Sequence, residues 1–245
     1  MKKYLFVAIG LLFGAGIMTS VPALAEFDTA ELQMVVVKST DGALKEGTVI
    51  NGASPLKLNR GTSVTLIGSD GSIVTLKGPY QKSPANELKG KTKDPGIVKA
   101  LGALLSQRQI STAALGVVRS ATPAASGQLP DPWAVSINRS GDRCIRNDFV
   151  VLWRDDATTR DTVTISLPDA NLTAQADWAA GDRMLPISSK KFRDRGRYTF
   201  ELGKQRVLLT LHRVPENVNG VAAQAAWMAK TGCEIQALAM LDTIR

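Results

Sequence analysis

Alternating cations are the most suggestive chemical pattern of this sequence: Lys191, Arg193, Arg195 and Arg197. Side chains two residues apart share one face of an extended chain, so the four cations would line that face. Tyr198 adjoins them, and Trp178 and Phe192 are near enough in sequence for their rings to stack. A face of this kind could bind a phosphate or an acidic sugar. The alternative is a loop around Gly196 whose charges contact solvent.

Residue types that catalyse reactions or hold metals are scarce and scattered. His212 is the only histidine, and its place in the apolar stretch 207–214 predicts a structural side chain in a strand. One histidine excludes most imidazole metal sites. Asp155, Asp156 and Asp161 flank a polar loop that lacks the glycine and alternating oxygens of a calcium loop, and we expect a solvated hairpin tip there. The sequence therefore predicts no catalytic residue, no metal and no cofactor.

The first 25 residues have the pattern of a cleavable signal peptide. Two lysines precede an apolar run of 14 residues, 5 to 18, which suits a signal peptide and is short for a membrane span. Ala23 and Ala25 are the small residues of a cleavage site, so we expect cleavage after Ala25. The short basic head resembles bacterial signal peptides, which implies the periplasm. No later apolar stretch approaches spanning length, so no membrane span is expected after cleavage.

The two cysteines, Cys144 and Cys233, both follow the predicted cleavage site. An even number of cysteines in an oxidising compartment predicts one disulfide. Neither cysteine has C-x-x-C spacing or a cluster of histidines beside it, which argues against a thiol redox site or a zinc site. We expect the bond to join the front of a C-terminal domain to its last helix.

The charge balance of the processed chain is moderately basic. Removing Lys2 and Lys3 leaves 28 of the 30 basic residues against 22 acidic residues, a formal net charge of +6. Such an excess favours anionic partners, although it is also common in exported proteins that simply stay in solution. We expect an envelope protein or an anionic glycan or lipid as partner, and no nucleic acid. The oligomeric state is left open.

Residues 26–92 have the pattern of a small all-β domain. Apolar, β-branched runs predict strands at 34–37, 64–67 and 73–76. The Asp-Gly pair within 68–72 suits the tight turn of a hairpin. Gly78-Pro79 ends the last strand, because proline has no N–H to donate to a sheet.

Residues 93–132 predict one helix followed by a linker. Asp94-Pro95 combines an N-cap with a proline at the first helical position, and apolar residues recur at helical spacing over 95–108. Residues 119–132 are rich in Ser, Thr, Pro, Gly and Ala with little apolar bulk, which is typical of a linker.

Residues 133–245 predict a β-sandwich closed by C-terminal helices, so the whole chain is expected to be mainly β. Strands are expected at 133–137, 149–153, 162–167, 172–177, 198–202 and 206–211. After Pro215 the apolar period changes to 3.6, which predicts a helix over 218–229. Thr231-Gly232 ends that helix, and a second short helix follows over 235–244.

Segments 47–50, 61–66 and 70–79 together resemble the FecR-like periplasmic β-domain, with a strand, an Asp-Gly turn, a strand and a Gly-Pro stop across about 35 residues. The resemblance implies a small exported β-domain of the kind found in iron-siderophore signalling regulators and in many other exported proteins. FecR regulators carry a membrane helix that this pattern lacks, so transmembrane signalling is not implied. The C-terminal half resembles uncharacterised bacterial exported proteins in Cys144, Trp153-Arg154, Trp178, Gly181, Ala226-Trp227-Met228 and Gly232-Cys233.

Two hypotheses of function follow. The first is a non-enzymatic periplasmic protein that binds or scaffolds partners in the cell envelope, because two β-rich modules accompany no clustered catalytic set. The second is a hydrolase of anionic envelope polymers, with Asp155, Asp156 or Asp177 acting beside the arginine-rich segment.

Overall fold

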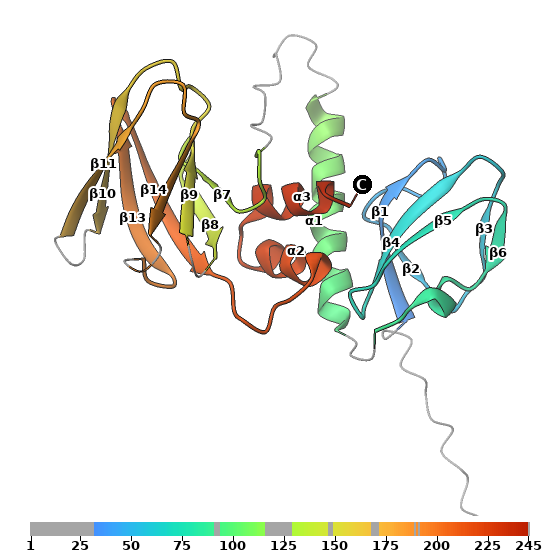
Figure 1. Cartoon of the computed structure of the whole chain (residues 1–245). Helices are drawn as coiled ribbons and strands as arrows, with labels where there is room; N and C mark the ends of the chain where they lie inside the picture. The colour runs from blue at the N-terminus through green and yellow to red at the C-terminus, as the bar shows by residue number, and fades with distance from the viewer. Residues whose placement is uncertain are drawn as a thin grey trace, which may run out of the picture.

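The computed structural model describes residues 32–90, 94–115, 129–146, 149–167, 172–188, 190 and 192–244, and of 110–115 only the backbone. The predicted signal peptide, with Ala23 and Ala25, lies outside these ranges, as does most of the predicted linker. The fold is mainly β, as predicted, with several sheets and three helices, two of them at the C-terminus (Figure 1). Within the described ranges, no helix is long and apolar enough to cross a membrane.

The N-terminal β unit contains a four-stranded antiparallel sheet of order β2-β1-β4-β5 and a two-stranded sheet of β3 and β6. Its elements are β1 Gln33–Ser39, β2 Val49–Asn51, β3 Leu56–Leu58, β4 Ser63–Gly68, β5 Ile73–Lys77, β6 Tyr80–Lys82 and the short 3-10 helix η2 Pro84–Glu87. The predicted strands correspond to β1, β4 and β5. The pattern missed β2, β3 and β6, since three residues are too few for an alternation to show.

The predicted hairpin joins β4 to β5. Ile67 pairs with Ile73 next to the turn, and Gly71 has φ 76°, a conformation that favours glycine. At the other end, the Gly78 N–H donates to the Thr62 carbonyl at 2.9 Å, and Pro79 follows outside the ladder.

The central strands β1 and β4 are buried on both faces, which explains their uninterrupted apolar runs. One face, with Met34, Val36 and Leu66, closes the core of the N-terminal unit. The opposite face, with Val35 and Ile67, packs against helices.

Helix α1, Pro95–Leu115, begins where predicted and extends beyond the expected end at 108. Asp94 caps it: its carboxylate accepts from the Gly96 N–H at 2.8 Å, and its carbonyl accepts from the Ile97 N–H at 2.9 Å. Leu101 and Leu105 are fully buried on the apolar side of the helix.

The C-terminal β unit packs a five-stranded sheet, β11-β10-β13-β14-β8, against a three-stranded sheet, β12-β9-β7. The strands are β7 Ala134–Ser136, β8 Gly141–Ile145, β9 Phe149–Trp153, β10 Asp161–Leu167, β11 Leu172–Trp178, β12 Met184–Ser188, β13 Gly196–Leu202 and β14 Gln205–Arg213. All six predicted strands are present. The pattern missed β8, which carries two charged residues, and β12, which contains Pro186 at a sheet edge.

Helices α2, Val221–Lys230, and α3, Glu234–Asp242, follow as predicted. Gly232 ends α2 with φ 86°, and the Cys233 N–H donates to the Met228 carbonyl at 2.9 Å while the Gly232 N–H donates to that of Ala229. This pair of bonds is the Schellman motif.

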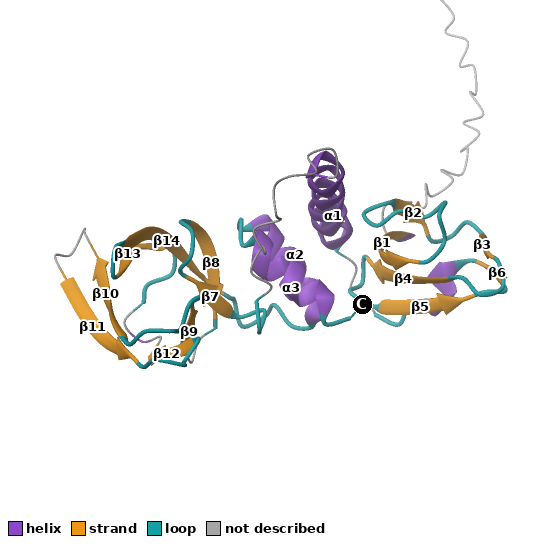
Figure 2. Ribbon diagram, turned by 90° about the horizontal axis from the view of Figure 1, so that it is seen from above, coloured by secondary structure: helices purple, strands orange, loops and turns teal. Residues whose placement is uncertain are grey.

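All three helices share one apolar core with the helix-facing side of the first sheet. Leu101 of α1, Ala225 of α2 and Met240 of α3 belong to the same cluster as Val35 and Ile67. The helices therefore lie between the two β units, which Figures 1 and 2 show from two directions. The sequence pattern predicted the helices but not that α2 and α3 pack on α1.

The predicted disulfide joins Cys144 of β8 to Cys233 between α2 and α3, with Cα atoms 5.9 Å apart. Gln236 reinforces the connection: its side-chain Oε1 accepts from the Cys144 N–H at 2.7 Å, and its Nε2 donates to the Cys144 carbonyl at 2.8 Å. Gln236 is 1% exposed, so both bonds are shielded from water.

Replacing both cysteines (Cys144→Ala with Cys233→Ala) is expected to lower the free energy of unfolding by up to about 4.6 kcal/mol, because the bond closes a long loop, with 89 residues of separation. Urea unfolding measures this loss. Reduction of the wild-type protein should reproduce it, and two free thiols in a non-reducing peptide map would contradict the pairing.

Leu101→Ala is expected to cost about 2–5 kcal/mol, because the side chain is fully buried in the shared helical core. Hydrogen exchange should accelerate in β1 and in α3 together. Lys99→Ala, on the exposed side of the same helix, is the matched control. Faster exchange in β1 alone would show that the core is not shared.

Candidate functional site

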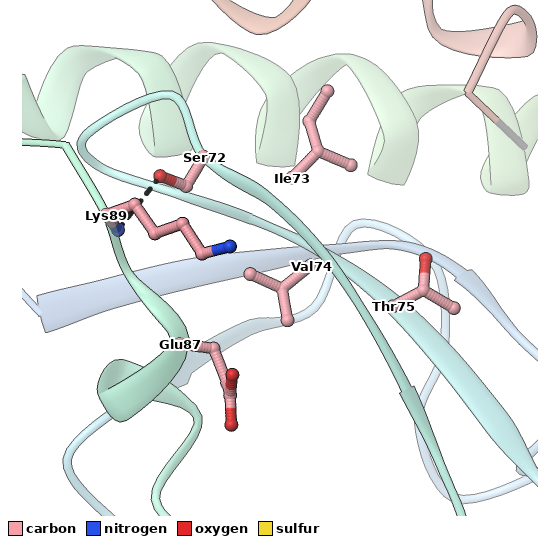
Figure 3. A pocket seen from close by; sticks show the side chains of 6 residues that line it. All are labelled: Ser72, Ile73, Val74, Thr75, Glu87 and Lys89. Atoms are coloured by element: carbon pink, nitrogen blue, oxygen red, sulfur yellow. Dashed lines mark hydrogen bonds between the residues drawn. The ribbon is translucent and has the colours of Figure 1, made fainter.

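A groove of about 340 Å³ runs beside β5 in the N-terminal unit. We call it the β5 groove; Figure 3 shows the residues that line it, which are Ser72, Ile73, Val74, Thr75, Glu87 and Lys89. Four of them are consecutive. Because alternate side chains of a strand point to opposite faces, four consecutive residues can line one wall only if the backbone edge of the strand forms it.

The register of β5 identifies which backbone groups lie on that edge. Gly68 donates to the Ser72 carbonyl and Gly78 to that of Thr62, and between these two points β4 and β5 pair without a shift. In an antiparallel ladder every second residue bonds to the neighbour, so Val74 and Leu76 bond to β4. The N–H and C=O groups of Ile73 and Thr75 point away from β4. Among the described residues, no further strand pairs with β5.

The opposite wall of the groove is held in place by Asp70. Its Oδ2 accepts from the Ser72 hydroxyl at 2.6 Å and from the Gly90 N–H at 2.7 Å, and its Oδ1 accepts from the Ser72 N–H at 2.9 Å. The Ser72 hydroxyl in turn accepts from the Lys89 N–H at 3.3 Å. We call these bonds the Asp70 clamp, and they attach residues 89–90 to the start of β5.

Electrostatics match this role of Asp70. Partial burial of the carboxyl raises its pKa, but the hydrogen bonds from Ser72 and Gly90 outweigh that effect, and the pKa lies below the ordinary value of 3.8. Gly90 is required beside it, since a Cβ atom there would lie 2.7 Å from the Asp70 Cβ. The Asp-Gly pair was visible in the sequence only as a turn signal, and the later partner Gly90 had no signal of its own.

The groove carries two charges of opposite sign, Glu87 and Lys89. Neither has an ion-pair partner among the described residues, and both side chains lie on the side of β5 to which Val74 points (Figure 3). Ile73 and Thr75 point to the other side, and Ile73 is 40% exposed.

The arginine-rich segment does not form the single extended face that its spacing predicted. Lys191 lies outside the described residues; Arg193 and Arg195 precede β13, and only Arg197 belongs to the strand. Arg195 has φ 55°, which is not an extended conformation, and it contacts Asp194 at 3.9 Å. Arg193, Arg195 and Arg197 are exposed to solvent, as the loop alternative expected, and the single extended face is not formed.

The aromatic residues near this segment belong to the core instead. Tyr198 is 3% exposed, its hydroxyl accepts from the Arg193 N–H at 2.7 Å, and its ring meets Phe192 edge to face at 5.0 Å. Trp178 is fully buried under the guanidinium of Arg154, 4.8 Å from the ring centre. These rings are therefore not accessible for stacking on a ligand.

The aspartates of the hydrolase hypothesis are exposed and separate from the arginine-rich segment. Asp155 and Asp156 lie in the loop between β9 and β10, which belong to different sheets, so the predicted hairpin tip was wrong. Hydrogen bonds from Thr158 lower the pKa of Asp156. Asp177 bonds to the Arg160 guanidinium at 3.0 Å and to the Thr162 hydroxyl at 3.1 Å, and these bonds lower its pKa.

The register places Asp177 and Arg197 at opposite ends of the five-stranded sheet. Asp177 pairs with Thr162, which lies level with the turn after β13, whereas Arg197 is near the start of β13. Six strand positions separate these levels, or about 20 Å. The structure therefore does not bring these carboxylates and arginines together.

His212 lies in β14, as predicted, and is half-buried. Its Nε2 is 2.7 Å from Oδ1 of Asp142, a contact that ties β14 to β8. Within the described part of the chain, no group of three or more His, Cys, Asp or Glu residues could hold a metal ion.

No protein-family model matches this chain, and no curated protein or solved structure matches it. The FecR-like resemblance of the N-terminal half stays a prediction.

Asp70→Asn is expected to lower the free energy of unfolding by about 1 kcal/mol at pH 7, because an amide cannot replace both accepting oxygens. The folded pKa of Asp70 lies below the unfolded value, so its stabilisation is complete above pH 3.8 and is lost as the pH falls through the lower folded value. Urea unfolding of both proteins should show their difference shrinking below about pH 4. A difference that stays constant down to pH 3 would contradict the clamp.

Proposed function

We propose that this protein is an exported, non-enzymatic binding or scaffolding protein of the bacterial cell envelope, and that the β5 groove binds a partner protein there. The observation that carries the proposal is the groove itself, whose wall is the backbone edge of β5. Such an edge offers main-chain hydrogen bonds to another polypeptide.

The Asp70 clamp supports a binding role because it forms the groove in advance. Residues 89–90 are attached to the turn before β5, so a partner meets a wall that is already in place. Binding to a preformed site avoids the entropic cost of ordering it.

The shared helical core supports a scaffolding role. It packs α1 against the first sheet and against α2 and α3, and the disulfide attaches α3 to the C-terminal β unit. A partner bound at the first sheet is thereby held at a fixed position relative to the second unit.

The placement of the aspartates favours binding over hydrolysis. Asp155 and Asp156 are exposed, Asp177 is bonded to Arg160 and Thr162, and about 20 Å separates Asp177 from Arg197 along the sheet.

Export is supported by the signal-like first 25 residues and is consistent with the single disulfide.

A photo-crosslinking amino acid at Ile73, in the full chain expressed with its own leader in a bacterium, is expected to yield a discrete protein adduct. Osmotic shock should release the protein with the periplasmic fraction. Leu172, 60% exposed on β11 of the C-terminal unit, is the matched control position and should give no such adduct. No adduct at 73, or the same adducts at both positions, would overturn the proposal.

A triple variant tests the anionic glycan or lipid as the alternative partner. Arg193→Gln with Arg195→Gln and Arg197→Gln removes the exposed arginines and leaves the β5 groove intact. The adduct at 73 should persist in this variant. Loss of the adduct in this variant would indicate that the partner binds the C-terminal unit instead.

A further inference from the structure

We infer that the occupant of the β5 groove is an extended peptide segment of the partner protein, which adds to the N-terminal sheet as a strand next to β5. The inference rests on the proposed function and specifies the chemistry of its partner. It combines the free edge, the length of the groove and the two charges on its wall.

The free edge sets the mode of binding. Ile73 and Thr75 direct their N–H and C=O groups away from β4 and toward the groove. An extended peptide satisfies these groups with a ladder of main-chain hydrogen bonds, which no rigid small molecule of comparable size can match. Of the usual protections against pairing, β5 carries only Lys77 at its end, since it contains no proline and its register with β4 shows no bulge.

The length of the groove sets the size of the segment. Three residues of β5 line it, together with Ser72 just before the strand, and a strand advances by about 3.3 Å per residue, so three or four partner residues lie alongside. The side chain of Val74 points to the same side of β5 as Glu87 and Lys89 (Figure 3). The central partner residue on that side would therefore contact the aliphatic side chain of Val74 and lie between the two charged groups.

The charges select the partner sequence. Glu87 and Lys89 are two residues apart and have no ion-pair partner among the described residues. The complementary strand carries one cation and one anion two residues apart, on the face that meets this wall.

A second copy of this chain does not fit that requirement. Two copies of β5 paired edge to edge would each contribute the strand Ile73–Lys77, whose only charged residue is Lys77. The paired strand itself would then present no anion to Lys89. The charge pattern therefore favours a different polypeptide that carries both signs.

The test uses the full chain purified after export and a nine-residue fluorescent peptide in which valine and threonine alternate with one lysine and one glutamate two positions apart. Binding is followed by fluorescence anisotropy. Hydrogen exchange on the complex should show new protection at the Ile73 and Thr75 amides, because these amides face the groove and gain partners. Protection elsewhere without protection of β5 would overturn the inference.

Two variants at one position separate the backbone from the side chain. Thr75→Pro removes an N–H that faces the groove and leaves the hydrogen bonds between β5 and β4 in place. Proline is tolerated at such an edge position. Thr75→Val keeps the N–H but removes the hydroxyl that contacts Thr65 at 3.2 Å. We expect Thr75→Pro to weaken binding about tenfold and Thr75→Val to leave it unchanged. Equal binding by both variants would refute strand addition.

Charge exchange tests the selectivity. A peptide with its lysine and glutamate swapped should bind more weakly than the original, and the double variant Glu87→Lys with Lys89→Glu should reverse that preference. Unchanged preference in the double variant would refute the role of these charges. Dimerisation at β5, seen in sedimentation without peptide and abolished by Thr75→Pro, would instead identify a second copy as the occupant.

Failure of this inference is distinguishable from failure of the proposed function. If Ile73 still gives a protein adduct in the envelope and Thr75→Pro leaves that adduct intact, the groove binds a partner by another mode. If no adduct forms at 73, the binding role itself is wrong.

Discussion

The apolar core shared by α1, α2, α3 and the first sheet is the interaction on which the arrangement of this protein depends. The chain contributes to it in three passes: β1 and β4 first, α1 next, and α2 with α3 only after the whole C-terminal β unit. That β unit is therefore inserted between helices that need one another for burial. The disulfide and the two hydrogen bonds of Gln236 attach the inserted unit to the same core. The two β units therefore meet through this core.

Among the described residues, the sheet edges at β8, β12 and β5 receive different treatment, while β2, β7 and β11 are also edge strands. At β8, the side-chain amide of Gln236 bonds to both backbone groups of Cys144 and so covers part of that edge. At β12, Pro186 removes a donor from the edge. At β5, the Asp70 clamp holds residues 89–90 beside the strand. These residues do not cover the edge, and a groove lies between them and β5. An unpaired edge is a liability in a protein that has no use for it.

The C-terminal unit buries cations without burying carboxylates beside them. Arg143 is 6% exposed and donates to the carbonyls of Ser136, Asp142 and Arg139, and burial lowers its pKa. Arg154 donates to the carbonyls of Ala179 and Asp182 while it covers Trp178. Arg143 thereby joins β8 to β7, strands of the two sheets, and Arg154 attaches the end of β9 to the loop between β11 and β12. They stabilise the sandwich, whereas the described arginines predicted to bind a ligand are exposed, Arg193 and Arg195 before β13 and Arg197 in it.

The sequence by itself determined the local structure. Apolar, β-branched runs located β1, β4, β5 and most C-terminal strands, the Asp94-Pro95 pair located the start of α1, and Thr231-Gly232 located the end of α2, because each depends on backbone preferences of adjacent residues. The cysteine count predicted the disulfide. Only the tertiary structure decided that α2 and α3 pack on α1, that Tyr198 and Trp178 are core residues, and that Gly90 completes the Asp70 clamp. Each of these outcomes joins residues distant in sequence or depends on which face of a strand is covered, and no local pattern encodes which surface a covered face will meet.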